Sequence, residues 1–285
     1  MKSLTLQAPA KINVFLKVKN KRKDGFHNIK TIFQRINLSD TLEFTLTKTG
    51  RIRLTSTLPT LPLGSKNLVY QAAEQLRLMY GVKNGIDIHI DKKIPVAAGL
   101  AGGSTNAATT LIGLNKIWQL GISKHTMIEH ARRLGSDVPF FLEHCSWAMG
   151  TARGDQIEPL DIGSRFWHIL VVPRKKITSG QVYQGLNLQL TKSVDNANIL
   201  IQHLKNKDLR NIGRYILNDL ESAIVQIAPS LQRLKERIKL LSGSGVMISG
   251  SGPAVFGLAK NQKDAEQFKS VLSRYYKRVY AIKTL

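Results

Sequence analysis

Alternating apolar and polar positions predict several strands in the first part of the chain. At residues 85–91 the stretch GIDIHID alternates isoleucine with polar residues, which is typical of a strand with one buried face. The stretch APAKINVFLKV at residues 8–18 alternates in the same way, so Lys11 and Asn13 are expected on one face. The patterns predict strands near residues 4–19, 29–46 and 86–91.

Apolar residues at helical spacing predict helices between these strands. One stripe occupies positions i, i+4, i+7 and i+11, at Ala107, Leu111, Leu114 and Trp118. Either Ser104 or Thr105 precedes the stripe and is expected to cap that helix. The predicted helices lie near residues 66–80, 104–119 and 124–134.

The later part of the chain changes pattern after a polar, glycine-containing stretch near residue 162. A strand is predicted at 165–173, helical segments follow from residue 195, and the chain then reads as helix, hairpin, helix and strand. Those last four elements are expected at residues 229–241, 245–259, 263–275 and 278–284. This order and a length of 285 residues predict two α+β domains, at residues 1–162 and 163–285.

A net charge of +23 raises the hypothesis of a nucleic-acid-binding protein, because lysine and arginine neutralise phosphates in such proteins. The basic excess is spread evenly along the chain. The local clusters at residues 19–23 and 174–176 are short and contain no aromatic residues. A generally basic surface that favours anionic ligands is the simpler interpretation.

The sequence also limits the protein class. No segment reaches the roughly 20 uncharged apolar residues of a membrane span, and Lys11 and Asn13 interrupt the N-terminal apolar run, unlike a signal peptide. We therefore expect a cytoplasmic protein with no membrane partner. The single cysteine, Cys145, excludes an internal disulfide, and the seven histidines include no H-E-x-x-H pair.

The stretch IPVAAGLAGGSTNAATTL, residues 94–111, places a glycine-rich turn before a predicted helix. It is not a P-loop, because Gly103 is followed by Ser104 and not by lysine, and its glycines do not fit the dinucleotide-binding spacing. No acid occurs between Asp91 and Glu129, so the helix dipole is left uncompensated. Two interpretations remain open: an anion cradle, or small residues that allow close packing.

Four other positions have both a structural and a functional interpretation. Lys11 is either a solvated strand lysine or a functional one. Asp137 follows a helix predicted to end at Gly135, and it is either a first-turn acid or a proton acceptor near a phosphate. The segments DGFH (24–27) and ISGSGPAVF (248–256) are either ordinary hairpin ends or parts of a site.

Taken in order, three segments resemble the signature motifs of the GHMP kinases, the superfamily of galactokinase, homoserine kinase and mevalonate kinase. They are APAKINVFLKV, IPVAAGLAGGSTNAA and ISGSGPAVF. The segments DGFHNI, LGSDVPFFL and ITSGQVY narrow the resemblance to the branch that acts on a cytidine-diphosphate-linked methylerythritol in the non-mevalonate isoprenoid pathway. The resemblance covers essentially the whole chain.

This resemblance implies a two-domain α+β fold. The N-terminal domain is expected to be like the second domain of ribosomal protein S5 and the C-terminal domain to be ferredoxin-like. It also implies an enzyme that transfers the γ-phosphoryl group of ATP, with Mg²⁺, to the 2-hydroxyl of the methylerythritol unit. The partner is then a small molecule carrying a cytidine diphosphate and no specific nucleic acid, and the protein is expected to be a monomer or weak homodimer.

The resemblance also assigns roles residue by residue. Asp137 matches the catalytic base and Lys11 the lysine beside it, which offsets developing charge. The positions that match ATP-binding residues are Asn67, Pro95, Gly99, Leu100, Ala101, Gly102, Gly103, Ser104 and Thr105. Those that match substrate-binding residues are Asn13, Phe26, His27, Ser179, Tyr183, Ser249 and Gly250. Ser104 is the candidate ligand for the metal.

Within these assignments, His27 is expected to read the cytosine base, with Phe26 and Tyr183 on either side of the ring. Ala101 stands where some relatives have glycine, and Ser179 where threonine is expected. Two alternatives remain: a GHMP kinase for mevalonate or homoserine, which has no need of the aromatic and histidine set, and a basic nucleic-acid-binding protein.

Overall fold

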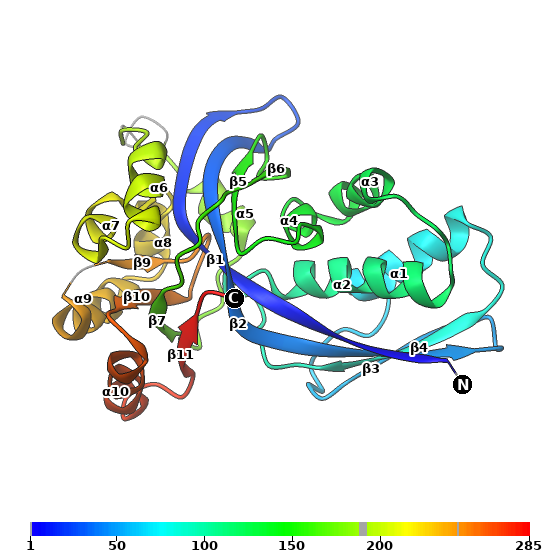
Figure 1. Cartoon of the computed structure of the whole chain (residues 1–285). Coiled ribbons are helices and arrows are strands. Elements are labelled where there is room, and N and C mark those ends of the chain that lie inside the picture. The colour runs from blue at the N-terminus through cyan, green and yellow to red at the C-terminus, as the bar shows by residue number, and fades with distance from the viewer. Residues whose placement is uncertain (1, 188–192, 244) are drawn as a thin grey trace. The chain divides into compact units, whose positions relative to one another are not determined.

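The computed structural model describes residues 2–187, 193–243 and 245–285 (Figure 1). Its packing divides the chain into two compact units, each assembled from separate stretches of sequence. The first unit comprises Met1–Ala10, Leu38–Val96 and Ala101–His144, and the second comprises Lys11–Asn37, Ala97–Leu100 and Cys145–Leu285. Two long strands, β1 (Ser3–Lys21) and β2 (His27–Thr47), therefore contribute residues to both units.

In the first unit, helices pack on one face of a sheet. Strand β4 (Gly85–Asp91) pairs antiparallel with β2 and parallel with β3 (Ile52–Ser56). The three isoleucines of β4 are buried, as their alternation predicts. Helices α1 (Leu68–Met79) and α2 (Gly102–Ile117) lie along this face (Figure 1), followed by α3 (Lys124–Leu134) and α4 (Val138–Leu142).

The second unit contains a four-stranded antiparallel sheet with the strand order β11-β7-β10-β9. Its strands are β7 (Trp167–Val171), β9 (Val246–Ile248), β10 (Val255–Ala259) and β11 (Val279–Lys283). Helices α9 (Ser230–Ser242) and α10 (Gln262–Ser273) pack against it through buried leucine and isoleucine side chains. This order of elements is the expected ferredoxin-like arrangement.

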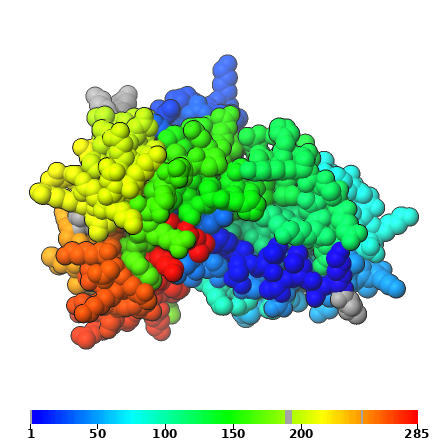
Figure 2. Space-filling model, viewed as in Figure 1, coloured from blue at the N-terminus to red at the C-terminus, as the bar shows by residue number. Residues whose placement is uncertain are grey.

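The remaining elements of the second unit extend the long strands or cover the core. Strand β2 pairs with β5 (Trp147–Thr151), β5 pairs with β6 (Gln156–Pro159), and β1 pairs with β8 (Leu217–Asn218). The other helices are α5 (Ser179–Gln184), α6 (Ala197–Lys205), α7 (Leu209–Tyr215) and α8 (Glu221–Ile227). Figure 2 shows α6 and α7 in yellow, and α10 in orange to red, on the surface of this unit.

Most predicted elements are present, with two corrections. The helix predicted at 104–119 begins two residues earlier, and its N-cap is Ala101, so neither Ser104 nor Thr105 caps it. The strand around residue 12 is not open to solvent on one face, because residues 11–16 are all buried. The sequence patterns missed β3, β5, β6 and β8 and the short helix α5.

In the part of the chain that the structure describes, no helix has the length and apolarity needed to cross a membrane. The domain boundary between residues 162 and 163 stays a prediction, since the two units are not continuous halves of the chain.

Candidate active site

Helix α2 in the first unit begins without the usual compensation for its positive end. Its N-cap, Ala101, has a left-handed backbone with φ of 53°, and within the described residues no side chain caps the helix. The first turn contains no acid. The Thr105 N–H donates to the Ala101 carbonyl at 2.9 Å, which leaves the N–H groups before it directed at the helix start. This end of α2 is suited to an anion.

The left-handed backbone at Ala101 explains why some relatives are expected to have glycine at this position. A residue with a Cβ is strained at positive φ, whereas glycine is not. Ala101 adopts this conformation nevertheless, so the loop keeps its shape with alanine at this position.

Two buried oxygen atoms in the first turns of α2 have no hydrogen-bond partner among the described residues. They are Oγ1 of Thr105 and Oδ1 of Asn106, and both side chains are buried. They do not form one set with the half-buried hydroxyl of Ser104, because side chains at consecutive positions of a helix point in different directions. Mg²⁺ prefers oxygen ligands and takes few protein carboxylates when it binds nucleotide phosphates. The half-buried Ser104 hydroxyl thus fits a nucleotide-bound Mg²⁺, and the described residues contain no cluster of three acidic, histidine or cysteine ligands.

The two glycines that start α2 differ in the space around them. A Cβ on Gly102 would lie 3.0 Å from Cγ2 of Ile94, which is a tight approach. A Cβ on Gly103 would meet only Cδ1 of Leu68, at an ordinary 3.7 Å, and Gly103 is exposed. Substitution at Gly103 therefore tests the anion cradle without a packing clash, whereas Gly102→Val would confuse the two effects.

We expect Gly103→Val to weaken ATP binding by about tenfold or more while the protein keeps its melting temperature within a few degrees. Cα–Cβ bonds tilt toward the N-terminus of a helix, so the new side chain would occupy the side from which an anion approaches the N–H groups. Titration calorimetry with ATP and with the cytidyl substrate measures the effect, and binding of the cytidyl substrate should be unchanged. Unaltered ATP affinity would contradict the anion cradle and leave close packing as the reason for the glycines.

Two other residues that are predicted to bind the nucleotide also lie in the first unit. Asn67 is the N-cap of α1: its side chain accepts from the Val69 N–H at 2.9 Å and donates to the Pro62 carbonyl at 2.6 Å. Pro95 is buried just after Ile94. A contact of Asn67 with ATP remains a prediction.

Asp137 lies at the start of α4 and is half-buried. As predicted, α3 ends at Gly135, which is its C-cap; the next helix, expected from Ser136 or Asp137, begins at Val138 with Asp137 as its N-cap. Within the described residues its side chain makes no capping hydrogen bond to α4, but as the N-cap it lies at the positive end of the helix dipole, so the structural interpretation stays open beside the catalytic one. Its function as a base stays a proposal.

In the second unit, Lys11 and Asn13 form a buried hydrogen-bonded chain. Lys11 Nζ donates to Asn13 Oδ1 at 2.6 Å, and Asn13 Nδ2 donates to Thr31 Oγ1 at 2.7 Å. Lys11 Nζ also lies 5.2 Å from the centre of the Phe33 ring. Lys11 is 4% exposed, so the solvated-lysine interpretation is wrong. Such a desolvated ammonium is held in one place, as charge stabilisation requires.

The turn after β9 joins this chain to the glycine-rich segment. The hydroxyl of Ser249 accepts from the Asn13 N–H at 3.2 Å and donates to the Gly99 carbonyl at 3.0 Å. The Lys11 N–H donates to the Leu100 carbonyl at 3.2 Å. Gly250 has φ of 54°, and a Cβ there would lie 2.9 Å from Asn13 Oδ1. Six predicted site residues thus lie together within this unit: Lys11, Asn13, Gly99, Leu100, Ser249 and Gly250.

A second group of predicted substrate residues surrounds His27. The rings of His27 and Tyr183 stack with centroids 5.1 Å apart and planes 22° apart. Phe26 is 52% exposed, and the Arg153 guanidinium lies 5.2 Å from its ring centre. Burial, with a smaller effect from Lys21, lowers the pKa of His27 below its usual value, so the neutral ring predominates at neutral pH.

Ser179 is the first residue of α5, which Thr178 caps through a capping box. The Ser179 hydroxyl is exposed and lies 2.8 Å from that of Ser251, in the turn that also contains Ser249 and Gly250. The structure thus links this predicted substrate residue to the same turn.

Sequence reasoning missed four residues that hold these groups in place. Thr31 and Phe33 contact Asn13 and Lys11, and Arg153 lies over Phe26. Asn218 donates through Nδ2 to the carbonyls of Ile248 at 2.9 Å and Gly250 at 2.8 Å. No motif signals these residues, because their partners are distant in sequence.

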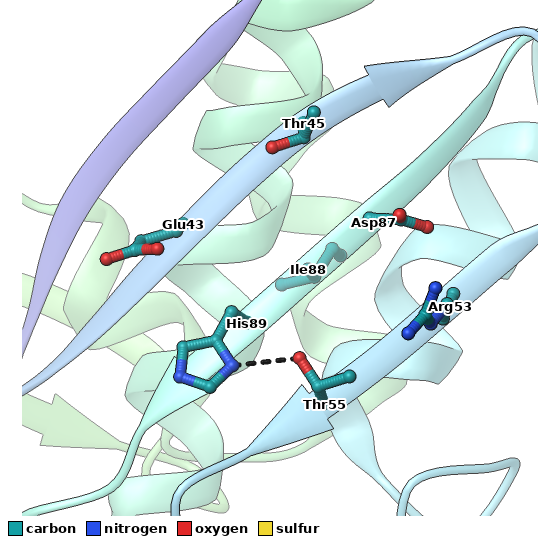
Figure 3. Close-up of a pocket in the computed structure, with 7 residues that line it drawn as sticks. All are labelled: Glu43, Thr45, Arg53, Thr55, Asp87, Ile88 and His89. Atoms are coloured by element: carbon teal, nitrogen blue, oxygen red, sulfur yellow. Dashed lines mark hydrogen bonds between the residues drawn. The ribbon is translucent and has the colours of Figure 1, made fainter.

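A hollow of ≈ 150 Å³ on the sheet of the first unit contains none of the predicted site residues (Figure 3). Its lining side chains come from β2, β3 and β4, and Thr55 Oγ1 lies 2.8 Å from His89 Nδ1. Glu43, Asp87 and Arg53 give it mixed charge, which does not suit a polyphosphate.

Comparison with known proteins defines the class to which this site belongs. Residues 67–144 match the GHMP kinases N terminal domain, and residues 200–278 match the GHMP kinases C terminal domain. The chain belongs to the GHMP kinases: it has their fold and is an ATP-dependent small-molecule kinase.

Particular relatives narrow this class. The chain is 39% identical over 282 residues to the 4-diphosphocytidyl-2-C-methyl-D-erythritol kinase of Bacillus cytotoxicus, which covers 99% of this chain and 97% of the relative. It is 36% identical over 281 residues to the enzyme of the same name from Shouchella clausii, which covers 99% and 94%.

Solved structures agree with these matches. The crystal structure of 4-(cytidine 5'-diphospho)-2C-methyl-D-erythritol kinase has a TM-score of 0.85 and 29% identity, and the match covers 98% of each chain. Homoserine kinase from Cytophaga hutchinsonii has a TM-score of 0.78 at 20% identity, covering 100% of this chain and 95% of that one. The second match shows the shared fold alone.

Proposed function

We propose that the protein transfers the γ-phosphoryl group of ATP to the 2-hydroxyl of 4-diphosphocytidyl-2-C-methyl-D-erythritol. The observation that carries this proposal is the full-length identity of 36% to 39% with kinases of that name. The stacked His27 and Tyr183 rings support it, since a mevalonate or homoserine kinase has no base to bind.

In the proposed reaction, the 2-hydroxyl oxygen attacks the γ-phosphorus, the bond to the β,γ-bridging oxygen breaks, and ADP leaves. Asp137 accepts the hydroxyl proton, and Lys11 stabilises charge that develops on the phosphoryl oxygens. The N–H groups at the start of α2 hold the phosphates. Bound Mg²⁺ would neutralise phosphate charge, and Ser104 is the residue we assign to it.

The proposal is tested by ADP release from ATP with three acceptors: the cytidyl-methylerythritol substrate, mevalonate and homoserine. Only the first should support turnover. A salt-dependent RNA-binding assay run beside it tests the nucleic-acid alternative, for which the net charge of +23 is the motivating observation. If mevalonate or homoserine supported turnover and the cytidyl-methylerythritol did not, the proposed substrate would be wrong.

The proposal includes a cytoplasmic location and a monomer or weak homodimer. Cell fractionation and light scattering across a range of protein concentrations measure these two properties directly.

We expect His27→Ala to raise KM for the cytidyl substrate, to spare KM for ATP and to narrow the preference over the uridyl analogue by about tenfold. A neutral imidazole nitrogen accepts a hydrogen bond from the exocyclic amine of cytosine, whereas uracil presents a carbonyl there; such a bond is worth roughly 1 to 3 kcal/mol. Kinetics with both substrates measure the ratio. An unchanged cytidyl-to-uridyl ratio of kcat/KM would remove His27 as the base reader.

The pH dependence of KM for the cytidyl substrate should follow the protonation of His27. Because burial lowers the pKa of His27, the accepting neutral form persists as the pH falls, and KM for the cytidyl substrate should rise only below about 6.5. In His27→Ala this rise in KM at low pH should be absent.

A further inference from the structure

A buried ion pair lies in the first unit between β4 and the glycine-rich segment. Lys92 Nζ and Asp40 Oδ2 are 2.6 Å apart, and their side chains are 4% and 0% exposed. Burial lowers the pKa of Lys92, and the nearby Asp40 carboxylate opposes that shift. Neither residue belongs to the motifs that resemble the kinase family.

The same pair fixes the backbone that leads to Pro95. Asp40 Oδ1 accepts the N–H groups of Lys93 and Ile94, both at 2.7 Å. Lys92 Nζ also donates to the Ile94 carbonyl. Asp40 therefore acts as an internal cap for the chain as it leaves β4, and its charge is satisfied by three donors.

The lysine end of the pair faces the start of α2. A Cβ built on Gly102, the first residue of that helix, would lie 3.2 Å from Lys92 Nζ. A cation at a helix N-terminus adds to the positive end of the dipole; Asp40 offsets the charge of Lys92, but the positive end of the dipole itself still favours an anion. The first turn supplies no acid, so nothing in α2 itself relieves this arrangement.

We propose that Lys92 and Asp40 are a positioning pair for nucleotide phosphates: Asp40 fixes the backbone at residues 93 and 94, and Lys92 places a buried positive charge behind the first residue of α2. This inference rests on the proposed ATP-binding function of α2. Lys92 acts through the helix start and does not itself contact the nucleotide. Its contribution should therefore scale with the number of phosphates on the ligand.

The test compares ATP, ADP and adenosine binding by titration calorimetry in Lys92→Met. We expect ATP affinity to fall by about tenfold or more, ADP affinity to fall less, and adenosine affinity to change by less than about twofold, because charge interactions persist over several ångströms in a partly buried site. A purely structural lysine would change all three ligands by the same factor.

Lys93→Met is the matched control. It removes the same charge one residue away, but Lys93 is 60% exposed and pairs with Asp91 at the surface. Its affinities for ATP and adenosine should equal those of the wild type within about twofold, since exposed pairs contribute little.

Lys92→Met leaves the Asp40 carboxylate buried without its cation, which can impair folding. The double variant Asp40→Asn with Lys92→Met removes both charges, while the amide oxygen of asparagine can still accept the two N–H groups. It should regain thermal stability relative to Lys92→Met but not ATP affinity.

Two results would overturn the proposal: wild-type ATP affinity in the folded double variant, or an equal loss of adenosine and ATP affinity. Failure of the wild-type protein to bind ATP at all would instead overturn the proposed function, so the two failures are distinguishable.

Discussion

Replacing Asp137 with asparagine is expected to lower kcat by about 10²-fold or more and to leave ATP affinity nearly unchanged. Asparagine has the same shape as aspartate but does not accept a proton at neutral pH. Asp137 is the N-cap of α4, and asparagine is also a favoured N-cap residue, so the substitution should leave the helix start in place. Steady-state kinetics with saturating substrates, beside calorimetry with ATP, separate turnover from binding.

Glu143→Gln is the control for this change, because it also converts a carboxylate to an amide, at the C-terminal end of the same helix. Glu143 pairs with Lys124 at 2.6 Å and has no assigned role in catalysis, so kcat should be nearly that of the wild type. Near-normal turnover in Asp137→Asn would return Asp137 to the role of a residue that merely precedes α4.

Replacing Lys11 with methionine is expected to lower kcat by about 10² to 10³-fold while the melting temperature changes by only a few degrees. The ammonium is held by Asn13 in a buried position, where a fixed charge stabilises a developing negative charge better than water does. Methionine keeps an unbranched apolar stem and removes the cost of burying a charge, which opposes the cost of leaving Asn13 Oδ1 without its donor. Kinetics and thermal unfolding of the same samples measure both quantities.

Lys17→Met is the control for Lys11→Met, because it removes a lysine six residues further along the same strand. Lys17 Nζ donates to Ser193 Oγ at 2.9 Å, in a part of the second unit with no assigned catalytic role. Its kcat should remain within about twofold of the wild type, as is usual for changes away from a site. Equal losses in Lys11→Met and Lys17→Met would mean that net charge matters and the position of Lys11 does not.

The sequence by itself determined the local elements of this protein. The alternation in residues 85–91 predicts β4. The apolar spacing and the flanking glycine predict α3 with its observed bounds. Both predictions succeed because the side chains that share one face of a strand or helix lie close together in the sequence. The ordered motifs also predicted the kinase family, which the family matches confirm; the roles of the site residues stay predictions.

Tertiary structure alone decided how the site residues are held. Lys11 looks like a solvated strand lysine until Asn13, Thr31 and Phe33 are placed around it. The helix start at Gly102 looks cappable by Ser104 or Thr105 until the left-handed Ala101 moves the cap upstream.

Long-range contacts account for this division. Ser249 bonds to Gly99, 150 positions earlier in the chain, and Asp40 bonds to Lys92, 52 positions later. Neither pairing leaves a periodic pattern, since hydrogen-bond and ion-pair partners are selected by the folded geometry and not by spacing along the sequence. Burial of both faces of β1 at residues 11–16 likewise depends on segments that are distant in the sequence. This burial holds Lys11 and Asn13 as a fixed polar pair and not as surface residues.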